Sequence, residues 1–191
     1  MKSNSKLLRL CVTALMSAAC YVAFTFIQFK IPVGDSFTSI HLGNAFNVLA
    51  ALMLGPIEGG IAGALGMGIG DILDPVYITS APKTIILKFM IGLVTGSVAH
   101  KILHIAKYSD NKKKSMQLAA IASAAGLGFN VIFDPLFSYV YKRFILGNAQ
   151  ATLMLAAFGS LSTVINAVLS IIVATLLYGA LCKSFNYDKY H

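Results

Sequence analysis

Long apolar stretches alternate with short polar segments along this chain, and the alternation predicts an integral membrane protein. Six apolar stretches are present, at about residues 7–28, 41–54, 57–73, 82–105, 116–141 and 151–182. About 20 consecutive apolar residues are enough to cross a bilayer as a helix. We therefore predict an all-α integral membrane protein, with six transmembrane helices in a single domain over residues 1–191.

Residues that break helices define the ends of these stretches. Asp74-Pro75 ends the third stretch, and Pro82 is well placed at the start of the fourth, where its missing N–H is not needed. An Asp-Pro pair recurs late in the fifth stretch, so Pro135 predicts a kink or break there near the outer face. The segment 30–39 is polar and contains helix breakers, which indicates an extended connection between the first two helices.

The composition supports a membrane protein and argues against a soluble one. Hydrophobic residues make up 57% of the chain and charged residues 12%, and the mean hydropathy is +0.76. Soluble domains carry roughly 25% charged residues. The chain therefore has too few charges for the surface of a soluble enzyme or for a disordered segment.

The basic excess follows the predicted topology. The formal net charge is +8, and with six crossings ten basic residues fall on the side of the termini and four on the other side, with Lys88 inside a helix. The ten are Lys2, Lys6, Arg9, Lys101, Lys107, Lys112, Lys113, Lys114, Lys183 and Lys189, and the four are Lys30, Lys83, Lys142 and Arg143. Because cytoplasmic loops are enriched in Lys and Arg, both termini are expected in the cytoplasm of a multi-pass cell membrane protein. No nucleic-acid partner is needed to explain the charge.

Metal, disulfide and nucleotide chemistry find little support in the sequence. The chain has three cysteines, an odd number, and no two of them are spaced like metal ligands. They are Cys11, Cys20 and Cys182. His100 and His104 are four residues apart but have no third ligand nearby, so we predict a solvated helix end. The sequence has no Walker A, H-E-x-x-H or G-x-S-x-G motif, and we predict no cofactor, no metal and no enzyme.

Small residues recur at four-residue spacing, which lets helices approach closely in lipid. Glycine stripes occur at Gly59 and Gly63, Gly66 and Gly70, and Gly92 and Gly96, and alanine stripes in the first helix at Ala14 and Ala18, and at Ala19 and Ala23. For the glycines we predict packing inside the bundle. The alanines are equally consistent with an internal contact and with an outer face for another protein.

Lys88 is an ionisable residue at membrane depth, and such residues are candidates for function. It lies one to two turns beyond Lys83 and shares a helix face with Thr84. Two interpretations stay open. The side chain extends outward to the interface, or it is a pocket cation that pairs with Asp134, Asp74 or a substrate group.

Other polar side chains lie at similar depth in the outer half of several helices. They comprise His41 and Asn44, with Asn47, in the second helix, Asn130 and Asp134 in the fifth, and Asn166, with Thr163 and Ser170, in the sixth. Singly, each is explained by a hydrogen bond between helices. Jointly they favour a pocket for a small polar ligand, with Phe37, Tyr77, Phe137 and Tyr139 as aromatic cover. A membrane enzyme using Asp71, Asp74 or Asp134 is a weaker alternative, because no catalytic spacing supports it.

Several sequence blocks resemble the substrate-binding S components of energy-coupling factor (ECF) vitamin transporters. The blocks are His41-Leu-Gly-Asn44, Leu52-Met-Leu-Gly-Pro56 with Gly59, Gly63 and Gly66, and Ala81-Pro-Lys-Thr84 with Lys88 and Gly92. The similarity covers about residues 7–182 and is closest to the branch with riboflavin-type, hydroxymethylpyrimidine-type and pyridoxine-type S components.

This resemblance implies a six-helix subunit that binds a water-soluble vitamin or precursor from outside, beneath a first outer loop at about residues 32–39. It implies docking on a transmembrane coupling subunit carried by two cytoplasmic ATPase subunits, with Ala14, Ala18, Ala19 and Ala23 at that contact. The substrate-binding residues would be His41, Asn44, Tyr77, Thr84, Lys88, Asn130, Asp134, Tyr139 and Asn166. Hydroxymethylpyrimidine or a vitamin B6 form is favoured, with pantothenate or riboflavin also compatible. A self-contained secondary transporter is the alternative.

Overall fold

The computed structural model describes residues 2–33, 36–145, 147 and 152–182. These residues form the α-helices α1 (Lys2–Thr25), α2 (Gly43–Leu54), α3 (Pro56–Leu73), α4 (Ala81–Ser97), α5 (Lys112–Val140) and α6 (Thr152–Leu181). An antiparallel hairpin of β1 (Gln28–Val33) and β2 (Ser36–His41) joins α1 to α2. Short 3₁₀ turns lie at Ile78–Ser80 and Ile105–Tyr108, and π-helical turns at Val98–Ile102 and Tyr141–Ile145 extend α4 and α5.

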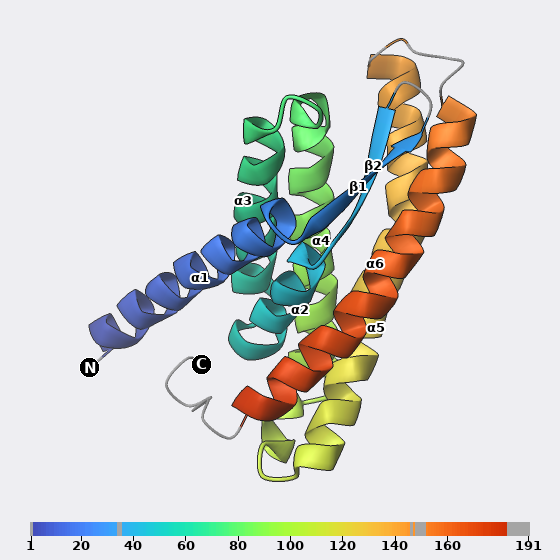
Figure 1. The fold of residues 1–191 in the computed structure, drawn as a ribbon. Coiled ribbons are helices and arrows are strands. Elements are labelled where there is room, and N and C mark those ends of the chain that lie inside the picture. Colours follow the sequence, from blue (N-terminus) through green and yellow to red (C-terminus); the bar gives the residue numbers. More distant parts are fainter. Residues whose placement is uncertain (1, 34–35, 146, 148–151, 183–191) are drawn as a thin grey trace.

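The helices form a bundle whose two ends differ (Figure 1). The start of α1, the turn between α2 and α3, and the end of α6 lie toward the lower end, and the α3–α4 connection lies at the upper end. Within the described residues, four helical segments are long and apolar enough to span a membrane: Lys6–Thr25, Ile78–Ile102, Lys112–Val140 and Gly159–Leu181. The multi-span prediction is confirmed to this extent, whereas six crossings and cytoplasmic termini stay predictions.

The hairpin is the largest difference from the sequence prediction. Segment 30–39 was predicted only to be extended, but it pairs in register from Gln28 opposite His41 to Val33 opposite Ser36. In Figure 1 the hairpin runs from the end of α1 toward the upper parts of α5 and α6. Helix α2 has only 12 residues. β2 precedes it, and the two together run through the bundle, with β2 as the upper half and α2 as the lower half (Figure 1).

Of the kink or break predicted at Pro135, the break is absent, because α5 continues through Pro135 to Val140. Proline removes one backbone hydrogen bond within a helix. Side chains on both sides of that position are held by neighbouring helices, since Lys83 of α4 contacts both Asp134 and Ser138. These contacts keep the helix in place across the missing bond. By contrast, α3 ends at Leu73, directly before Asp74-Pro75, as predicted.

The prediction that the glycine stripes pack inside the bundle is confirmed. A Cβ atom at Gly92 of α4 would collide with the backbone of Gly59 and Gly60 of α3, and one at Gly96 would collide with Pro56. Likewise, a Cβ at Gly66 would meet the backbone of α1 at Ser17. Glycine is therefore needed at these places for backbone to approach backbone, the usual means of close helix packing in membranes.

Gly126 and Gly128 of α5 provide a matched test of this packing. A Cβ at Gly126 would lie 2.8 Å from the Ile91 carbonyl oxygen and would overlap the Thr95 hydroxyl, whereas a Cβ at Gly128 has no atom within 4 Å. We expect Gly126→Ala to destabilise the fold by about 2 kcal/mol through overpacking. Gly128→Ala should be neutral or stabilise by up to about 1 kcal/mol through helix propensity. Thermal unfolding in detergent measures both, and equal effects would contradict this packing.

Candidate functional site

The hairpin is fastened to α6 by a single amide. The side-chain oxygen of Asn166 accepts from the His41 backbone N–H at 2.8 Å, and its nitrogen donates to the Ser39 carbonyl at 3.0 Å. Asn166 therefore satisfies the edge of β2 much as a neighbouring strand would. Backbone outside helices is tolerated at membrane depth only where protein or water satisfies its polar groups. Asn166 thus allows β2 to enter the bundle.

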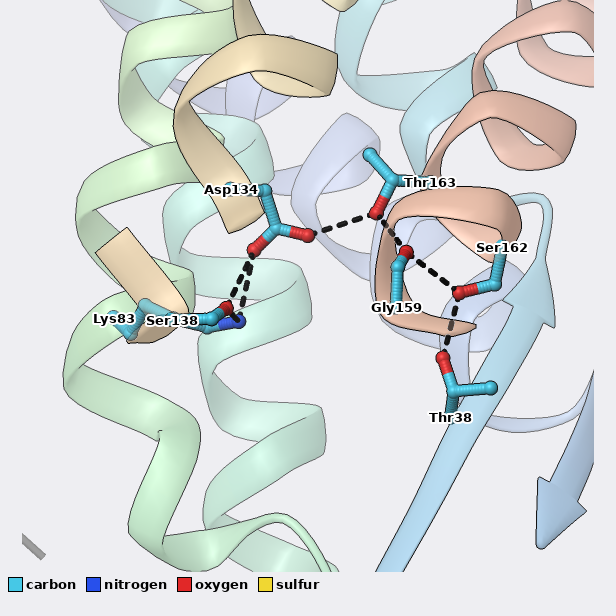
Figure 2. Close-up of polar contacts among 7 residues, drawn as sticks. All are labelled: Thr38, Lys83, Asp134, Ser138, Gly159, Ser162 and Thr163. Carbon is cyan, nitrogen blue, oxygen red and sulfur yellow. Dashed lines mark hydrogen bonds and ion pairs between the residues drawn. The ribbon is translucent and has the colours of Figure 1, made fainter. Parts of the chain in front are cut away.

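Asp134 of α5 is enclosed by polar partners from three helices (Figure 2). Its Oδ1 pairs with Nζ of Lys83 at 2.8 Å and accepts from the Ser138 hydroxyl at 3.4 Å. Its Oδ2 accepts from the Thr163 hydroxyl of α6 at 2.9 Å. The side chains of Lys83 and Asp134 are only 16% and 21% exposed, so most of this pair is shielded from water. Asp134 therefore joins α4, α5 and α6.

The same network reaches the hairpin through the start of α6. The Gly159 carbonyl lies 2.7 Å from the Thr163 hydroxyl and 3.0 Å from the Ser162 hydroxyl, which donates to it. Thr38 of β2 in turn donates to Ser162 at 2.6 Å. Figure 2 shows the resulting chain of contacts from Lys83 to Thr38. Two predicted binding residues, Asp134 and Asn166, are thus already engaged by internal partners.

Four other predicted binding residues are placed differently, because their polar atoms have no internal partner. His41, Asn44 and Asn130 are 6%, 1% and 2% exposed. Their Nδ1 or Oδ1 atoms are shielded from solvent and make no hydrogen bond within the described part of the chain. The Lys88 ammonium also forms no ion pair or hydrogen bond with any described residue. Buried polar groups are nearly always paired, so these four indicate a site for a polar molecule.

The helices that carry Asn44, Lys88 and Asn130 share an apolar layer with α6. The layer consists of Ala45, Val48, Ile91, Leu127, Ala167 and Ala174, with Val131, Ile171 and Val173 packed against it. α5 runs opposite to α2 and α4 (Figure 1). Asn44, Lys88 and Asn130 each lie within about one helical turn of a member of this apolar layer, namely Val48, Ile91 and Leu127.

The remaining predicted residues are Thr84, Tyr77 and Tyr139. Thr84, one turn above Lys88, is buried and faces the carboxyl of Asp71. Tyr77 is half-buried in the α3–α4 connection, and its hydroxyl likewise makes no hydrogen bond within the described part of the chain. Tyr139 is 41% exposed on α5, and so it lies apart from the buried groups.

An ion pair connects the hairpin to the α3–α4 connection. The Lys30 ammonium of β1 lies 2.5 Å from the Asp74 carboxylate and 5.4 Å above the ring of Tyr77. Partial burial acts to raise the pKa of Asp74. Hydrogen bonds from Lys30 and from the Val76 backbone N–H outweigh this and hold the pKa below its usual value. The contact is therefore intact at neutral pH.

We expect this contact to be lost at acid pH. Since the pKa of Asp74 is lower in the folded protein, its contribution to stability is present above the unfolded value and disappears as pH falls through the folded value. Lys30 is 37% exposed, so the contribution is under about 1 kcal/mol. Lys30→Met should therefore unfold at a lower temperature than wild type at pH 7 and at the same temperature near pH 3. A difference independent of pH would contradict the assignment to Asp74.

From the sequence alone, Lys83 is assigned to the outer loops and is not identified as the partner of Asp134. One feature of the sequence points to such a partner. Lys83 lies in the first turn of α4, whose first turn has no acidic residue, and a cation is unfavourable at a helix N-terminus. A lysine in that position indicates a partner from elsewhere in the fold.

An apolar groove runs along α1, on the side where the alanine stripes lie. Its volume is about 340 Å³, and it is lined by Leu15, Ala18, Ala19, Val22, Ala23, Ile27 and Phe46. Ala14 and Ala18 are exposed, Ala19 is half-buried, and Ala23 is 1% exposed at the base of the groove. The alanines are therefore divided, since Ala23 packs inward while Ala14 and Ala18 remain accessible.

Among the described residues, the lower end of the molecule carries no comparable cluster. His100, predicted to be solvated, is half-buried, with its Nε2 3.1 Å from the Ala51 carbonyl. Arg9 of α1 forms an ion pair with Glu58 of α3. Both contacts tie neighbouring helices together at the end where the chain begins.

Comparison with known proteins assigns the chain to a family. The family model described as ECF-type riboflavin transporter, S component, matches residues 4–183. The chain belongs to this family. As an S component with several apolar helices, it is a multi-pass cell membrane protein of a vitamin transport system.

The S component also has similar relatives among curated proteins and solved structures. It is 28% identical over 140 residues to a UPF0397 protein of Exiguobacterium sp., covering 71% of this chain and 75% of the relative. It is 29% identical over 75 residues to an uncharacterized protein of Pyrococcus woesei, covering 39% and 49%. A crystal structure of the S component for biotin from an ECF-type ABC transporter superposes with a TM-score of 0.60 at 21% identity, covering 93% and 94%. At that identity the likeness shows the shared fold.

Proposed function

We propose that this S component is the high-affinity substrate-binding membrane subunit of an ECF-type ABC importer for a small water-soluble vitamin or vitamin precursor. The observation that carries the proposal is a set of four groups without an internal partner among the described residues: shielded side-chain atoms of His41, Asn44 and Asn130, and the partly accessible ammonium of Lys88. Such groups are costly to leave unsatisfied. A polar ligand bound among them would satisfy them together.

The candidate substrates differ in what they offer to these groups. A hydroxymethylpyrimidine or vitamin B6 heterocycle provides hydroxyl donors for the unpaired side-chain oxygens of Asn44 and Asn130. Pantothenate adds a carboxylate for Lys88, and riboflavin would need a wider space. The hairpin covers the site from above, and Lys30 with Asp74 holds it in place.

Binding to the purified chain without ATP tests this proposal. A panel of vitamins and precursors is titrated against the detergent-purified S component, and the rise in its unfolding temperature is recorded. We expect one compound class to raise it by several degrees, because a ligand that binds only the folded state stabilises it. No shift with any compound, together with no small molecule released on denaturation, would contradict the function.

The proposed partners are a transmembrane coupling subunit and two cytoplasmic ATPase subunits. The groove on α1 supports a contact with the coupling subunit, because small residues line it and leave room for an apolar helix. Small residues are typical of helix contacts in lipid. Ala14 and Ala18 are the accessible members of this surface.

Filling the groove should separate assembly from binding. We expect Ala18→Leu to abolish co-purification with the coupling subunit while leaving vitamin binding unchanged, since Ala18 lies far along α1 from the hairpin. Ala124→Leu places the same bulk on an exposed position of α5 and is the control. If Ala18→Leu assembles as well as Ala124→Leu, the partner contacts another surface.

A self-contained secondary transporter is the alternative. It requires a path through both halves of the membrane, whereas an apolar layer is packed between α2, α4, α5 and α6. Liposomes that contain only the S component should therefore show no vitamin uptake under an ion gradient. Uptake by this chain alone would favour the alternative.

A further inference from the structure

Lys88 lies in the middle of the buried face of α4. Thr84 and Ile91, on the same face, are buried, while Lys88 itself retains partial accessibility. The Asn47 amide donates to the Lys88 backbone carbonyl at 2.9 Å, which fixes α2 against α4 at this level. The side chain therefore belongs to the interior of the bundle rather than to its lipid-facing side.

No nearby carboxylate is available to Lys88. The charged groups that act on it are Asp134, Lys83 and Asp71. Asp134 is occupied by Lys83 at 2.8 Å and by Thr163 at 2.9 Å, and Asp71 faces Thr84. Among the described residues, neither carboxylate comes within ion-pair distance of Lys88.

An ammonium without a counter-ion at membrane depth is strongly unfavourable. Asp134 and Asp71 are both directed to other partners, and moving Asp134 would break the contacts that hold α4, α5 and α6 together. The remaining source of negative charge is the ligand. The buried side-chain oxygens of Asn44 and Asn130 are uncharged acceptors without a partner among the described residues.

We propose that Lys88 binds a carboxylate of the transported compound, and that the substrate is therefore a vitamin or precursor carrying one negative charge. This inference rests on the proposed function. One ammonium among neutral amides matches one carboxylate, whereas a phosphate dianion would call for a second cation. Lys83, the next cation, is already paired with Asp134.

A substrate carboxylate for Lys88 favours an acid over hydroxymethylpyrimidine or a neutral vitamin B6 form. A neutral heterocycle would satisfy the amides and leave the Lys88 ammonium unpaired. An acid of the pantothenate kind satisfies both.

Matched acid and amide or alcohol pairs test the inference on the full-length chain in detergent. The probes are pantothenate and pantothenol, biotin and biotinamide, and nicotinate and nicotinamide, with pyridoxal 5′-phosphate and pyridoxal as the phosphate arm. The small molecule released from each freshly purified protein on denaturation is identified by its mass and by its retention on an anion exchanger. The variants are Lys88→Met, Lys88→Arg and the charge-removal control Lys101→Met, whose residue lies in the π-helical turn that follows α4.

We expect wild type to release or bind a carboxylic acid. Lys88→Met should bind it at least about 30-fold more weakly, the loss typical of removing one partner of a buried charge pair. Lys88→Arg and Lys101→Met should retain it. The ligand-free Lys88→Met protein should unfold at the same or a higher temperature than wild type, because no internal partner is lost.

Several results would overturn the inference. These are a neutral compound or a phosphate ester in the wild-type site, undiminished acid binding by Lys88→Met, or unfolding of that variant. The first and second would leave the proposed function intact. If wild type releases nothing and binds no probe, the proposed function fails and the inference fails with it.

Discussion

Replacing Asp134 with Asn is expected to destabilise the S component by about 3 kcal/mol, the usual effect of removing one partner of a buried ion pair. Lys83, only 16% exposed, would lose the carboxylate 2.8 Å from its ammonium. The Thr163 hydroxyl would exchange a charged acceptor for a neutral one. The loss is large because the contact joins three helices and the lysine left behind is shielded from water.

A double-mutant cycle measures this contact. Lys83→Met in the Asp134→Asn background removes the unpaired cation, and we expect it to recover most of the lost stability. Unfolding is followed by the reaction of buried Cys20 and Cys182 with a thiol probe, in a Cys11→Ser background because Cys11 is exposed. If the two single losses add in the double variant, the ion pair does not carry the effect.

Asn166→Ala is expected to cost about 3 kcal/mol, because it leaves two buried backbone groups of β2 without partners at about 1–3 kcal/mol each. These groups are the His41 N–H and the Ser39 carbonyl, now bonded at 2.8 and 3.0 Å. The hairpin should then separate from α6, and affinity for the vitamin should fall as well. Hydrogen exchange of the β2 amides, together with thermal unfolding, measures the change.

Ser170→Ala is the matched control for Asn166→Ala. Ser170 lies one turn further along the same helix, is fully buried, and its hydroxyl has no partner among the described residues. Its removal should leave stability unchanged or slightly improved. Equal losses in the two variants would mean that the amide of Asn166 has no special part in holding the hairpin.

The helices could be predicted from the sequence because their signals are local. Apolar length and breakers such as Asp74-Pro75 placed most helix ends within a few residues of those observed. The hairpin could not be predicted in this way, since β2 is stabilised by Asn166, more than 120 residues away. The continuation of α5 past Pro135 likewise depends on Lys83, in another helix.

The residues of the candidate site could be predicted from the sequence, but not which of them pair inside the protein and which stay unpaired. Depth and residue type identified His41, Asn44, Lys88 and Asn130 together with Asp134 and Asn166. Which of them pair inside the protein depends on distances between helices, which a single sequence does not contain. The partners of Asp134 and Asn166 distinguish these two residues from the four that remain unpaired.

Native mass spectrometry of the purified S component tests the central claim most directly. The account predicts one small molecule bound to each wild-type chain in the absence of ATP and of partner subunits. It also predicts that an Asn44→Leu/Asn130→Leu variant, shown to be folded by its cooperative thermal transition, carries none, because the side-chain oxygens of both residues are buried and unpaired among the described residues. A wild-type chain that is empty and stays empty when vitamins are added would contradict the account. So would a folded double variant with full occupancy.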